Sequence, residues 1–386
     1  MKKIVALFCT ACMMGGSVMA SGFKLEPPDS KSLTTNCKSA YLIDSDSGEC
    51  IYKENEKERM PIASVCKVMT LTLCLDAVNS GKLSLDDMIT ASDNAAGMGG
   101  SQVFLGSGCQ YKLDQLLKSI VICSANDSCV AVSETVAGNE ESFVAMMNQK
   151  ATELGCNDTL FANCTGLPKP TQYSCAHDVA IMFRNLLNYE SYFNYSKIWL
   201  EDFVHPDNRT TSMTNTNKLL RKYSLCDGGK TGFTNEAGFC LAATAKKDNM
   251  RLISVVLGAD NSDNRFSSTI NMFNFGFANY KNKIILDKDV TLNDEFAVSG
   301  GQKNSFAVCP ERNCYVFSAV NETPDVTHKV IAYNVKAPVA KGQIVGLIEV
   351  YKNGVLYDTV NVVSAEDVKK AGFGDNFRNI SENWAI

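Results

Sequence analysis

The feature that most constrains this chain is an almost unbroken apolar run from Val65 to Val78. It is long enough for about four helical turns, and Asn79-Ser80-Gly81 after it is typical of a helix end. The run is apolar on all sides rather than along one stripe. This pattern predicts a helix that is buried in the core of the protein.

Ser64 and Lys67 stand at the head of this run. Positions i and i+3 share a helix face, so we expect the Lys67 ammonium to reach the Ser64 hydroxyl. A serine hydroxyl is a poor nucleophile until a neighbouring base takes its proton, and a lysine can be that base when burial or nearby positive charge lowers its pKa. The alternative is a capping serine followed by a surface lysine, and further motifs must decide between the two.

The first 20 residues have the pattern of a secretory signal peptide. Two lysines precede an apolar stretch from Ile4 to Met14 that is short for a membrane span, and small residues lead to Ala20. We therefore expect an exported protein, in the periplasm or at the outer face of the cytoplasmic membrane. A lipoprotein acylated at Cys12 is an alternative, although the residues before Cys12 fit a lipid-attachment site poorly.

Length and charge narrow the class of protein. The 386 residues suffice for about two domains. The formal net charge is −5, and loss of the two lysines in the signal segment makes it more negative. Because no basic cluster is present, we expect no nucleic-acid partner.

Cysteine is unusually frequent, with 16 residues in the chain. Export favours disulfides, but the chain is much larger than a disulfide-stapled miniprotein, and the segment after residue 20 has no Cys-x-x-Cys pair or histidine cluster. We interpret most cysteines as small buried hydrophobic residues, and we expect no metal or cofactor. Two pairs could still form disulfides, Cys309 with Cys314 and Cys156 with Cys164.

Up to residue 283, strands and helices are mixed. Ser174 is expected to cap the helix that starts at Ala176. The short connections near residues 228–258 predict three adjacent antiparallel strands. Residues 83–111 are expected to form loops and short helices, and residues 156–176 a loop. The other predicted elements are strands at 38–43, 50–52, 238–245 and 250–258, and helices at 65–78, 113–122, 129–136, 141–154, 176–187 and 265–280.

The predicted secondary structure changes near Ile284 from mixed strands and helices to strands alone. Residues 284–364 hold short strand-like runs between turns and predict a small separate β-sandwich domain. The tail, 365–386, has one apolar helical stripe that could dock on this domain or lie in a membrane surface. The stripe consists of Phe373, Phe377, Ile380 and Trp384.

Two further motifs follow Ser64-Val65-Cys66-Lys67 in order, Ser124-Ala125-Asn126 and Lys230-Thr231-Gly232. Together they form one constellation for acyl transfer: a nucleophile and its base, then a hydroxyl for proton relay and an amide that holds the substrate. Lys230 supplies positive charge and Thr231 a hydroxyl where a substrate carboxylate would bind. Gly232 lets the substrate chain approach the strand closely.

An oxyanion needs two convergent backbone N–H groups, for which Ser64 and Phe233 are the candidates.

These motifs and their surroundings resemble the D-alanyl-D-alanine carboxypeptidases, which are low-molecular-mass penicillin-binding proteins of the S11 serine peptidase type. The resemblance covers about residues 37–280 and includes Phe161-Ala162-Asn163-Cys164-Thr165-Gly166-Leu167, Asp227-Gly228-Gly229-Lys230-Thr231-Gly232-Phe233-Thr234 and Arg251-Leu252-Ile253-Ser254-Val255-Val256-Leu257-Gly258.

It implies an α/β fold of the β-lactamase/transpeptidase type, an antiparallel sheet flanked by helices, followed by the small all-β sandwich. The expected division is a signal peptide (1–20), a peptidase domain (21–283), the β-sandwich (284–364) and the tail.

The resemblance also implies a reaction. The enzyme would remove the terminal D-alanine from peptidoglycan pentapeptide stems through an acyl-Ser64 intermediate, and β-lactams would acylate the same serine. Arg265 would help to hold the terminal carboxylate, the alternative being an arginine in a surface ion pair. Phe233 stands where some relatives carry histidine, which puts the rate and its pH dependence in doubt.

Other functions remain to be weighed. DD-endopeptidase activity needs the same groups, whereas a β-lactamase of class A needs a glutamate with Leu-Asn close behind it, which residues 153–167 lack. A non-catalytic cell-wall-binding protein would have no need of all five reactive residues. His177-Asp178 invites a catalytic-triad interpretation, but Ser–Lys chemistry does not require one.

Overall fold

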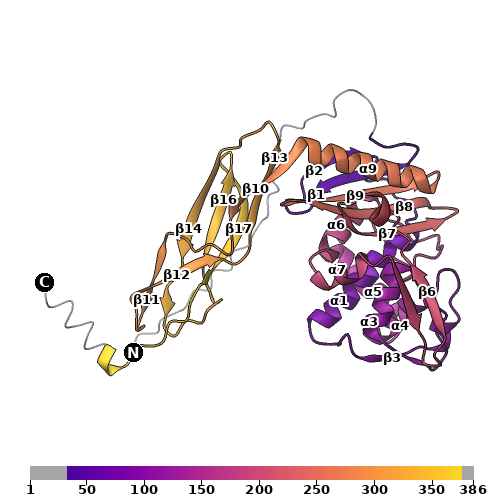
Figure 1. Ribbon diagram of the computed structural model, residues 1–386, viewed down its shortest axis with the longest axis horizontal. Coiled ribbons are helices and arrows are strands. Elements are labelled where there is room, and N and C mark those ends of the chain that lie inside the picture. The colour runs from indigo at the N-terminus through magenta and orange to yellow at the C-terminus, as the bar shows by residue number, and fades with distance from the viewer. Residues whose placement is uncertain (1–32, 376–386) are drawn as a thin grey trace, which may run out of the picture. The chain divides into compact units, whose positions relative to one another are not determined.

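The computed structural model describes residues 33–375, and a five-stranded antiparallel sheet organises their first part (Figure 1). The strand order is β2-β1-β9-β8-β7, so β7 lies at an edge. The three antiparallel neighbours expected from the short connections are β7, β8 and β9. The strands are β1 (Ser39–Asp44), β2 (Cys50–Glu54), β7 (Cys226–Thr234), β8 (Gly238–Lys247) and β9 (Met250–Ala259).

Both faces of this sheet are buried, as β9 illustrates. Leu252 and Val256 belong to the apolar core between the sheet and α9. Ile253, Val255 and Leu257 belong to the core on the opposite face of the sheet. Successive side chains of a strand point to opposite faces, so an unbroken apolar run such as β9 is stable only with cover on both sides.

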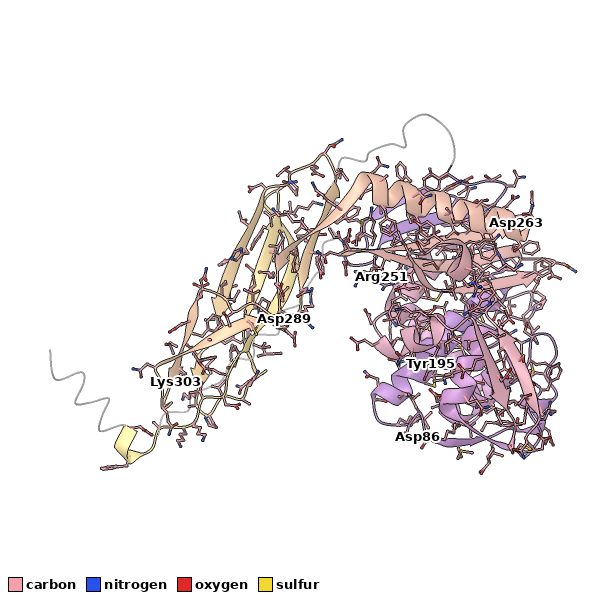
Figure 2. All side chains as sticks on the ribbon, viewed as in Figure 1. Asp86, Tyr195, Arg251, Asp263, Asp289 and Lys303 are labelled. Carbon is pink, nitrogen blue, oxygen red and sulfur yellow. The ribbon has the colours of Figure 1, made fainter. Side chains whose placement is uncertain are left out.

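Helices supply that cover. α9 lies along one face of the sheet, where the short helix α8 packs beside it, and the larger group of helices around α1 lies on the side of the opposite face (Figure 1). The hydroxyl of Tyr195, which is labelled in Figure 2, donates to Asp114 Oδ1 at 2.7 Å and so connects α7 to α3. The helices are α1 (Lys67–Asn79), α2 (Asp93–Ala96), α3 (Leu113–Ile122), α4 (Asn126–Ala137), α5 (Glu140–Glu153), α6 (Ala176–Leu186), α7 (Glu190–Ser196), α8 (Leu219–Lys222) and α9 (Ser262–Asn279).

α1 is the buried central helix that its composition predicted. It contacts α3, α4, α5 and α6, and all but three of its residues are buried. α3 has the predicted bounds, while α4 and α9 each begin three residues earlier than expected. The prediction that Ser174 caps α6 is wrong. Cys175 occupies the N-cap position, and the Ser174 hydroxyl lies 2.8 Å from that of Thr159 instead.

Two small two-stranded antiparallel sheets occur in stretches without a clear strand pattern. One pairs β3 (Met88–Thr90) with β4 (Gln110–Lys112) across a segment that includes α2, and the other is the hairpin of β5 (Leu200–Val204) and β6 (Thr210–Thr214). In β3 and β4 only the central residue is buried. A strand of three residues is too short for an alternation of apolar and polar residues to be recognised in the sequence.

The part after Tyr280 is built of strands around a separate apolar core. The two-stranded sheet β10-β13 and a six-stranded sheet, in the order β14-β16-β17-β12-β11-β15, both contribute side chains to that core, which confirms the predicted β-sandwich. The strands are β10 (Tyr280–Leu286), β11 (Glu295–Ser299), β12 (Ser305–Pro310), β13 (Cys314–Ala319), β14 (Val326–Ala332), β15 (Val335–Lys336), β16 (Ile344–Lys352) and β17 (Val355–Ser364).

The two suggested disulfides are wrong, because all four cysteines are free. Cys309 lies on β12 and Cys314 on β13, and these strands belong to different sheets. The Cys156 thiol donates to the Asp178 carbonyl at 3.6 Å, and the Cys164 side chain is fully buried.

The predicted signal segment and the tail residues Phe377, Ile380 and Trp384 lie outside the described residues. Phe373, the first residue of the tail stripe, is 91% exposed. Within residues 33–375, no helix combines the length and the apolar composition needed to cross a membrane.

Candidate active site

Ser64 lies in a 3₁₀ turn, Ala63–Cys66, that leads directly into α1. Ala63 has a φ of 48°, which costs a non-glycine residue about 1 kcal/mol and is kept only where the surroundings enforce it. Gly166 packs against this turn, since a Cβ at residue 166 would lie 2.1 Å from the Ala63 carbonyl oxygen. The loop around Gly166 therefore holds the backbone that presents the serine.

Lys67 is the first residue of α1, and its side chain is fully buried. Its ammonium lies 2.8 Å from Ser64 Oγ, 2.7 Å from Asn126 Oδ1 and 2.5 Å from the Thr165 carbonyl oxygen. The last two oxygens are fixed acceptors. A neutral amine that donates to both would direct its lone pair at Ser64 Oγ, which is the geometry a general base requires.

Ser124 and Lys230 form the second pair of the site. Ser124 has a φ of 66°, at the turn between α3 and α4, and its hydroxyl lies 2.8 Å from the Lys230 ammonium. Lys230 comes from the edge strand β7 and donates also to the Thr231 carbonyl at 3.0 Å. Burial, reinforced by the charge of Lys67, lowers the pKa of Lys230 to about 7.

Asn126, the first residue of α4, connects Lys67 to the loop that contains Gly99. Its amide nitrogen donates to the Gly99 carbonyl at 2.7 Å, while its oxygen faces Lys67. Gly100 gives it room, because a Cβ there would lie 2.8 Å from Asn126 Nδ2. The neighbouring Asp127 carboxylate accepts from the backbone N–H groups of residues 103 and 105, which keeps this loop against α4.

The edge strand β7 approaches the nucleophile closely at Gly232. A Cβ at this position would lie 2.7 Å from the Ile62 carbonyl oxygen and 3.0 Å from the Ser64 backbone nitrogen. Only glycine therefore allows the Ser64 N–H and the strand around Phe233 to share one small volume. This is the arrangement expected of an oxyanion hole.

Sequence reasoning missed two members of the site. Thr165 supplies the carbonyl oxygen beside Lys67, and a backbone oxygen has no residue signature. Thr216 supplies a hydroxyl that lies 2.7 Å from Thr231 Oγ1, where a substrate carboxylate is expected. Thr216 follows β6 in a polar stretch, and only the fold brings it beside β7.

Arg265 has a different position from that expected of a carboxylate ligand. Its guanidinium donates to the carbonyl oxygens of Gly232 and Cys240, both at 3.2 Å, and lies over the rings of Phe239 and Phe266. These contacts place it on the backbone of β7 and β8. Phe233 is 52% exposed at the strand edge, with its ring centroid 4.4 Å from that of Phe239.

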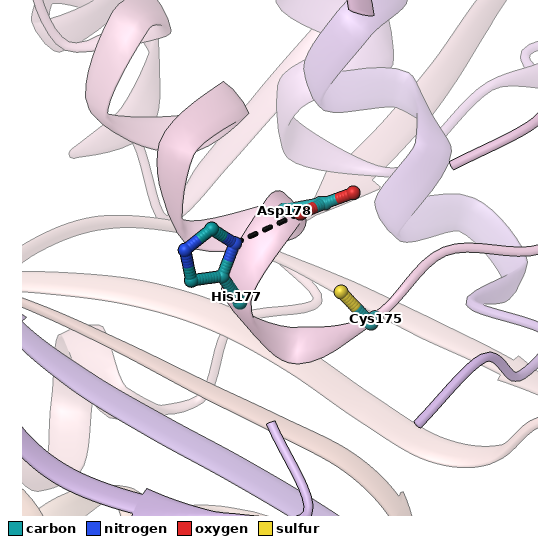
Figure 3. Close-up of side chains that lie close together, drawn as sticks. All are labelled: Cys175, His177 and Asp178. Atoms are coloured by element: carbon teal, nitrogen blue, oxygen red, sulfur yellow. Dashed lines mark hydrogen bonds and ion pairs between the residues drawn. The ribbon is translucent and has the colours of Figure 1, made fainter. Parts of the chain in front are cut away.

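One group of potential metal ligands lies outside this constellation, at the start of α6: Cys175, His177 and Asp178 (Figure 3). The Asp178 carboxylate already accepts from the Asp158 N–H and the Thr159 hydroxyl and lies 2.8 Å from His177 Nδ1. The Lys57 ammonium, 3.8 Å from the same carboxylate, would compete with a cation. These contacts fix the start of α6. The hydrogen-bond partners of the His177 side chain within residues 33–375 are Lys57 and Asp178, not Ser64.

The site defines a class of protein: a serine acyl-transfer hydrolase in which a buried lysine, rather than histidine, faces the nucleophile. The chain belongs to the D-alanyl-D-alanine carboxypeptidase family, whose sequence pattern matches residues 26–261. A second pattern, the C-terminal domain of penicillin-binding protein 5, matches residues 280–370. The resemblance drawn from the motifs and the expected hydrolase class are thereby confirmed.

Individual relatives agree with this assignment. The D-alanyl-D-alanine carboxypeptidase DacF of Bacillus subtilis is 35% identical over 386 residues, which cover 100% of this chain and 99% of DacF. DacC of Escherichia coli is 31% identical, over 88% of this chain and 86% of DacC. The structure of penicillin-binding protein 5 from Haemophilus influenzae is similar with a TM-score of 0.67 and 29% identity, and the match covers 90% of this chain and 100% of that one.

Proposed function

We propose that the protein is an exported carboxypeptidase that removes the terminal D-alanine from peptidoglycan pentapeptide stems through an acyl-Ser64 intermediate. The observation that carries the proposal is the position of the Lys67 side-chain nitrogen. Hydrogen bonds to Asn126 and Thr165 hold this nitrogen so that the lone pair of a neutral amine would point at Ser64 Oγ. The family assignment supports the same reaction.

Acylation begins when Ser64 Oγ attacks the carbonyl carbon of the penultimate D-alanine. Lys67 takes the hydroxyl proton as the new C–O bond forms. The Ser64 and Phe233 N–H groups stabilise the negative charge that develops on the carbonyl oxygen. Asn126 holds the substrate amide at the mouth of the site.

Collapse of the tetrahedral intermediate breaks the peptide C–N bond. The leaving amine needs a proton, and the Ser124 hydroxyl relays to it the proton that Lys67 took from Ser64, so that Ser124 keeps its hydroxyl and Lys67 is neutral again. Lys230, Thr231 and Thr216 surround the terminal carboxylate. Arg265 acts as a positioning residue that holds the β7 backbone from behind.

Deacylation uses the same groups on water. Lys67 takes a proton from a water molecule, which attacks the carbonyl carbon of the acyl-Ser64 ester. The ester C–O bond then breaks, Lys67 returns the proton to Ser64 Oγ, and the shortened stem peptide leaves. β-Lactams present a similar amide and carboxylate, so they acylate Ser64 as well.

We also propose the domain division 1–20, 21–283, 284–364 and 365–386, with the first segment as an export signal. The boundary at 283/284 falls within β10, which pairs with β13 from Tyr280 to Leu286. The tail is proposed to contact the membrane surface weakly.

The test uses the protein without residues 1–20 and its Ser64→Ala variant. Each is incubated with a fluorescent penicillin and then with diacetyl-Lys-D-Ala-D-Ala, and covalent labelling and released D-alanine are measured. We expect both signals in the protein and neither in the variant. Labelling without D-alanine release would replace the proposal with an endopeptidase or a binding protein, and a cross-linked peptide dimer as substrate separates those two. Absence of labelling would contradict Ser64 as the nucleophile.

A further inference from the structure

A pocket of about 430 Å³ opens where β7 ends, beside the loop that holds the Ser64 turn. Neither the three motifs nor the carboxylate site uses it. Six of its lining residues define its shape and charge: Ile62, Gly166, Lys169, Tyr173, Thr234 and Glu236.

The direction of the substrate leads to this pocket. β7 is an edge strand, so an extended peptide can lie along it as an added strand. The terminal carboxylate lies near Thr231 and the scissile carbonyl near the Phe233 N–H. Successive residues of a strand advance about 3.3 Å, so the residues that precede the two D-alanines pass Thr234 and reach Glu236.

Two charges in the pocket have no partner among the described residues, the Lys169 ammonium and the Glu236 carboxylate. Both side chains are exposed, and neither forms an ion pair or hydrogen bond. Arg59, the other charged residue of the lining, is already paired with Asp158 at 2.9 Å and lies over the Tyr173 ring. One cation and one anion are therefore available to a ligand.

The loop that carries Lys169 is well suited to hold a charge in place. Lys169 stands between Pro168 and Pro170, whose rings fix the backbone φ. The Lys169 carbonyl accepts the Gln172 N–H, and the Gln172 side chain accepts from the N–H groups of Ala162 and Asn163. The cation is thus presented from an ordered turn.

We propose that this pocket binds the charged groups of the stem peptide that precede the two D-alanines. Glu236 binds the side-chain ammonium of a diamino acid at the third position of the stem. Lys169 binds the carboxylate of the acidic residue at the second position. This inference rests on the proposed function, because it places the D-alanines at Ser64. Glu236 and Lys169 are specificity-determining residues, not catalytic ones.

The first test compares Nα-acetyl-Lys-D-Ala-D-Ala, with a free side-chain ammonium, and the diacetyl peptide that lacks it. We expect kcat/KM about five- to tenfold higher for the free amine, the ratio for one partly solvated ion pair of about 1 kcal/mol. Glu236→Gln should bring this ratio close to one by lowering only the free-amine value. Glu141→Gln, an exposed glutamate on α5, is the matched control and should leave the ratio unchanged.

The second test addresses Lys169 with pentapeptides that carry either D-glutamate or its amide at the second position. We expect a preference of about fivefold for the carboxylate, and Lys169→Met should abolish it while the labelling rate with fluorescent penicillin stays the same. Equal ratios in the protein and both variants would overturn the proposal.

A binding measurement distinguishes failure of the pocket proposal from failure of the proposed function. Each peptide also competes with fluorescent penicillin for Ser64, whether or not D-alanine is released. A charge preference in this competition that disappears in Glu236→Gln supports the pocket even if no peptide is cleaved. A competition without charge preference contradicts it, even if cleavage occurs.

Discussion

The two parts of the chain, before and after Tyr280, bury different kinds of side chain. In the first part Lys67 and Lys230 are almost completely inaccessible, together with several aspartates. Among the described residues from Tyr280 to Asp375, the buried polar side chains are those of Ser318 and Ser364. Burial of a charge is costly, so it persists where function requires it. The first part carries a reactive site, and the second has the core of a structural domain.

The largest effect is expected from removing the base. Lys67→Met should lower the rate of acylation by fluorescent penicillin at least about 10³-fold, because no other group accepts the Ser64 proton. The melting temperature should not fall, since an apolar side chain replaces a buried amine. Lys329→Met, at an exposed position of β14, should change neither quantity. A Lys67→Met protein that is acylated at a similar rate would show that another base serves Ser64.

Lys230→Met should separate activity from stability. The pKa of Lys230 is lowered to about 7, so the folded protein binds this proton less tightly than the unfolded chain does. The resulting cost is fully present below pH 7, declines as the pH rises and is absent above the unfolded value near 10.5. We therefore expect a higher melting temperature at pH 6 and little change at pH 10, while acylation falls about 10²-fold or more.

The lowered pKa of Lys230 also predicts that the activity of the unmodified protein falls on the alkaline side of its pH–rate profile. In the free enzyme Lys230 is charged below pH 7, so kcat/KM for a carboxylate substrate should decline above that pH. A profile that stays flat to pH 9 would contradict the requirement for a Lys230 ammonium.

Matched glycine substitutions test whether the two parts differ in function as well as in packing. Gly232→Ala would place a Cβ 2.7 Å from the Ile62 carbonyl oxygen, and Gly346→Ala would place one 2.5 Å from that of Ile331 in the sandwich. Both should destabilise the protein by about 1–3 kcal/mol in urea unfolding. Acylation should fall about 10²-fold only for Gly232→Ala, because only that change displaces the Ser64 amide.

The smallest effects are expected from two ion pairs. Arg251, which is labelled in Figure 2, binds both oxygens of Asp227 at 2.8 Å, and each of the two side chains is 17% exposed. Arg312 binds Asp358 in the sandwich with the arginine 52% exposed. Arg251→Met should cost about 2 kcal/mol and Arg312→Met about 1 kcal/mol or less, measured by urea unfolding. Equal losses would show that burial does not set the strength of these pairs.

The sequence predicted those elements whose physical cause is local. α1 is apolar on every side, α3 has one clear apolar stripe, and β9 is an unbroken run between turns, so each was found close to its true bounds. Elements that depend on distant partners were missed or misplaced. The three-residue strands β3 and β4 exist only because they pair with each other.

The same division holds for the site. The reactive side chains and their order could be predicted from the amino-acid sequence, because all of them stand in short motifs: Ser64, Lys67, Ser124, Asn126 and Lys230. Tertiary structure alone decided that Thr165 and Thr216 join them, that Arg265 supports the backbone of β7, and that Lys169 and Glu236 line one pocket. Those contacts join residues far apart in the chain, and their geometry follows from sheet order and loop packing, which no local pattern encodes.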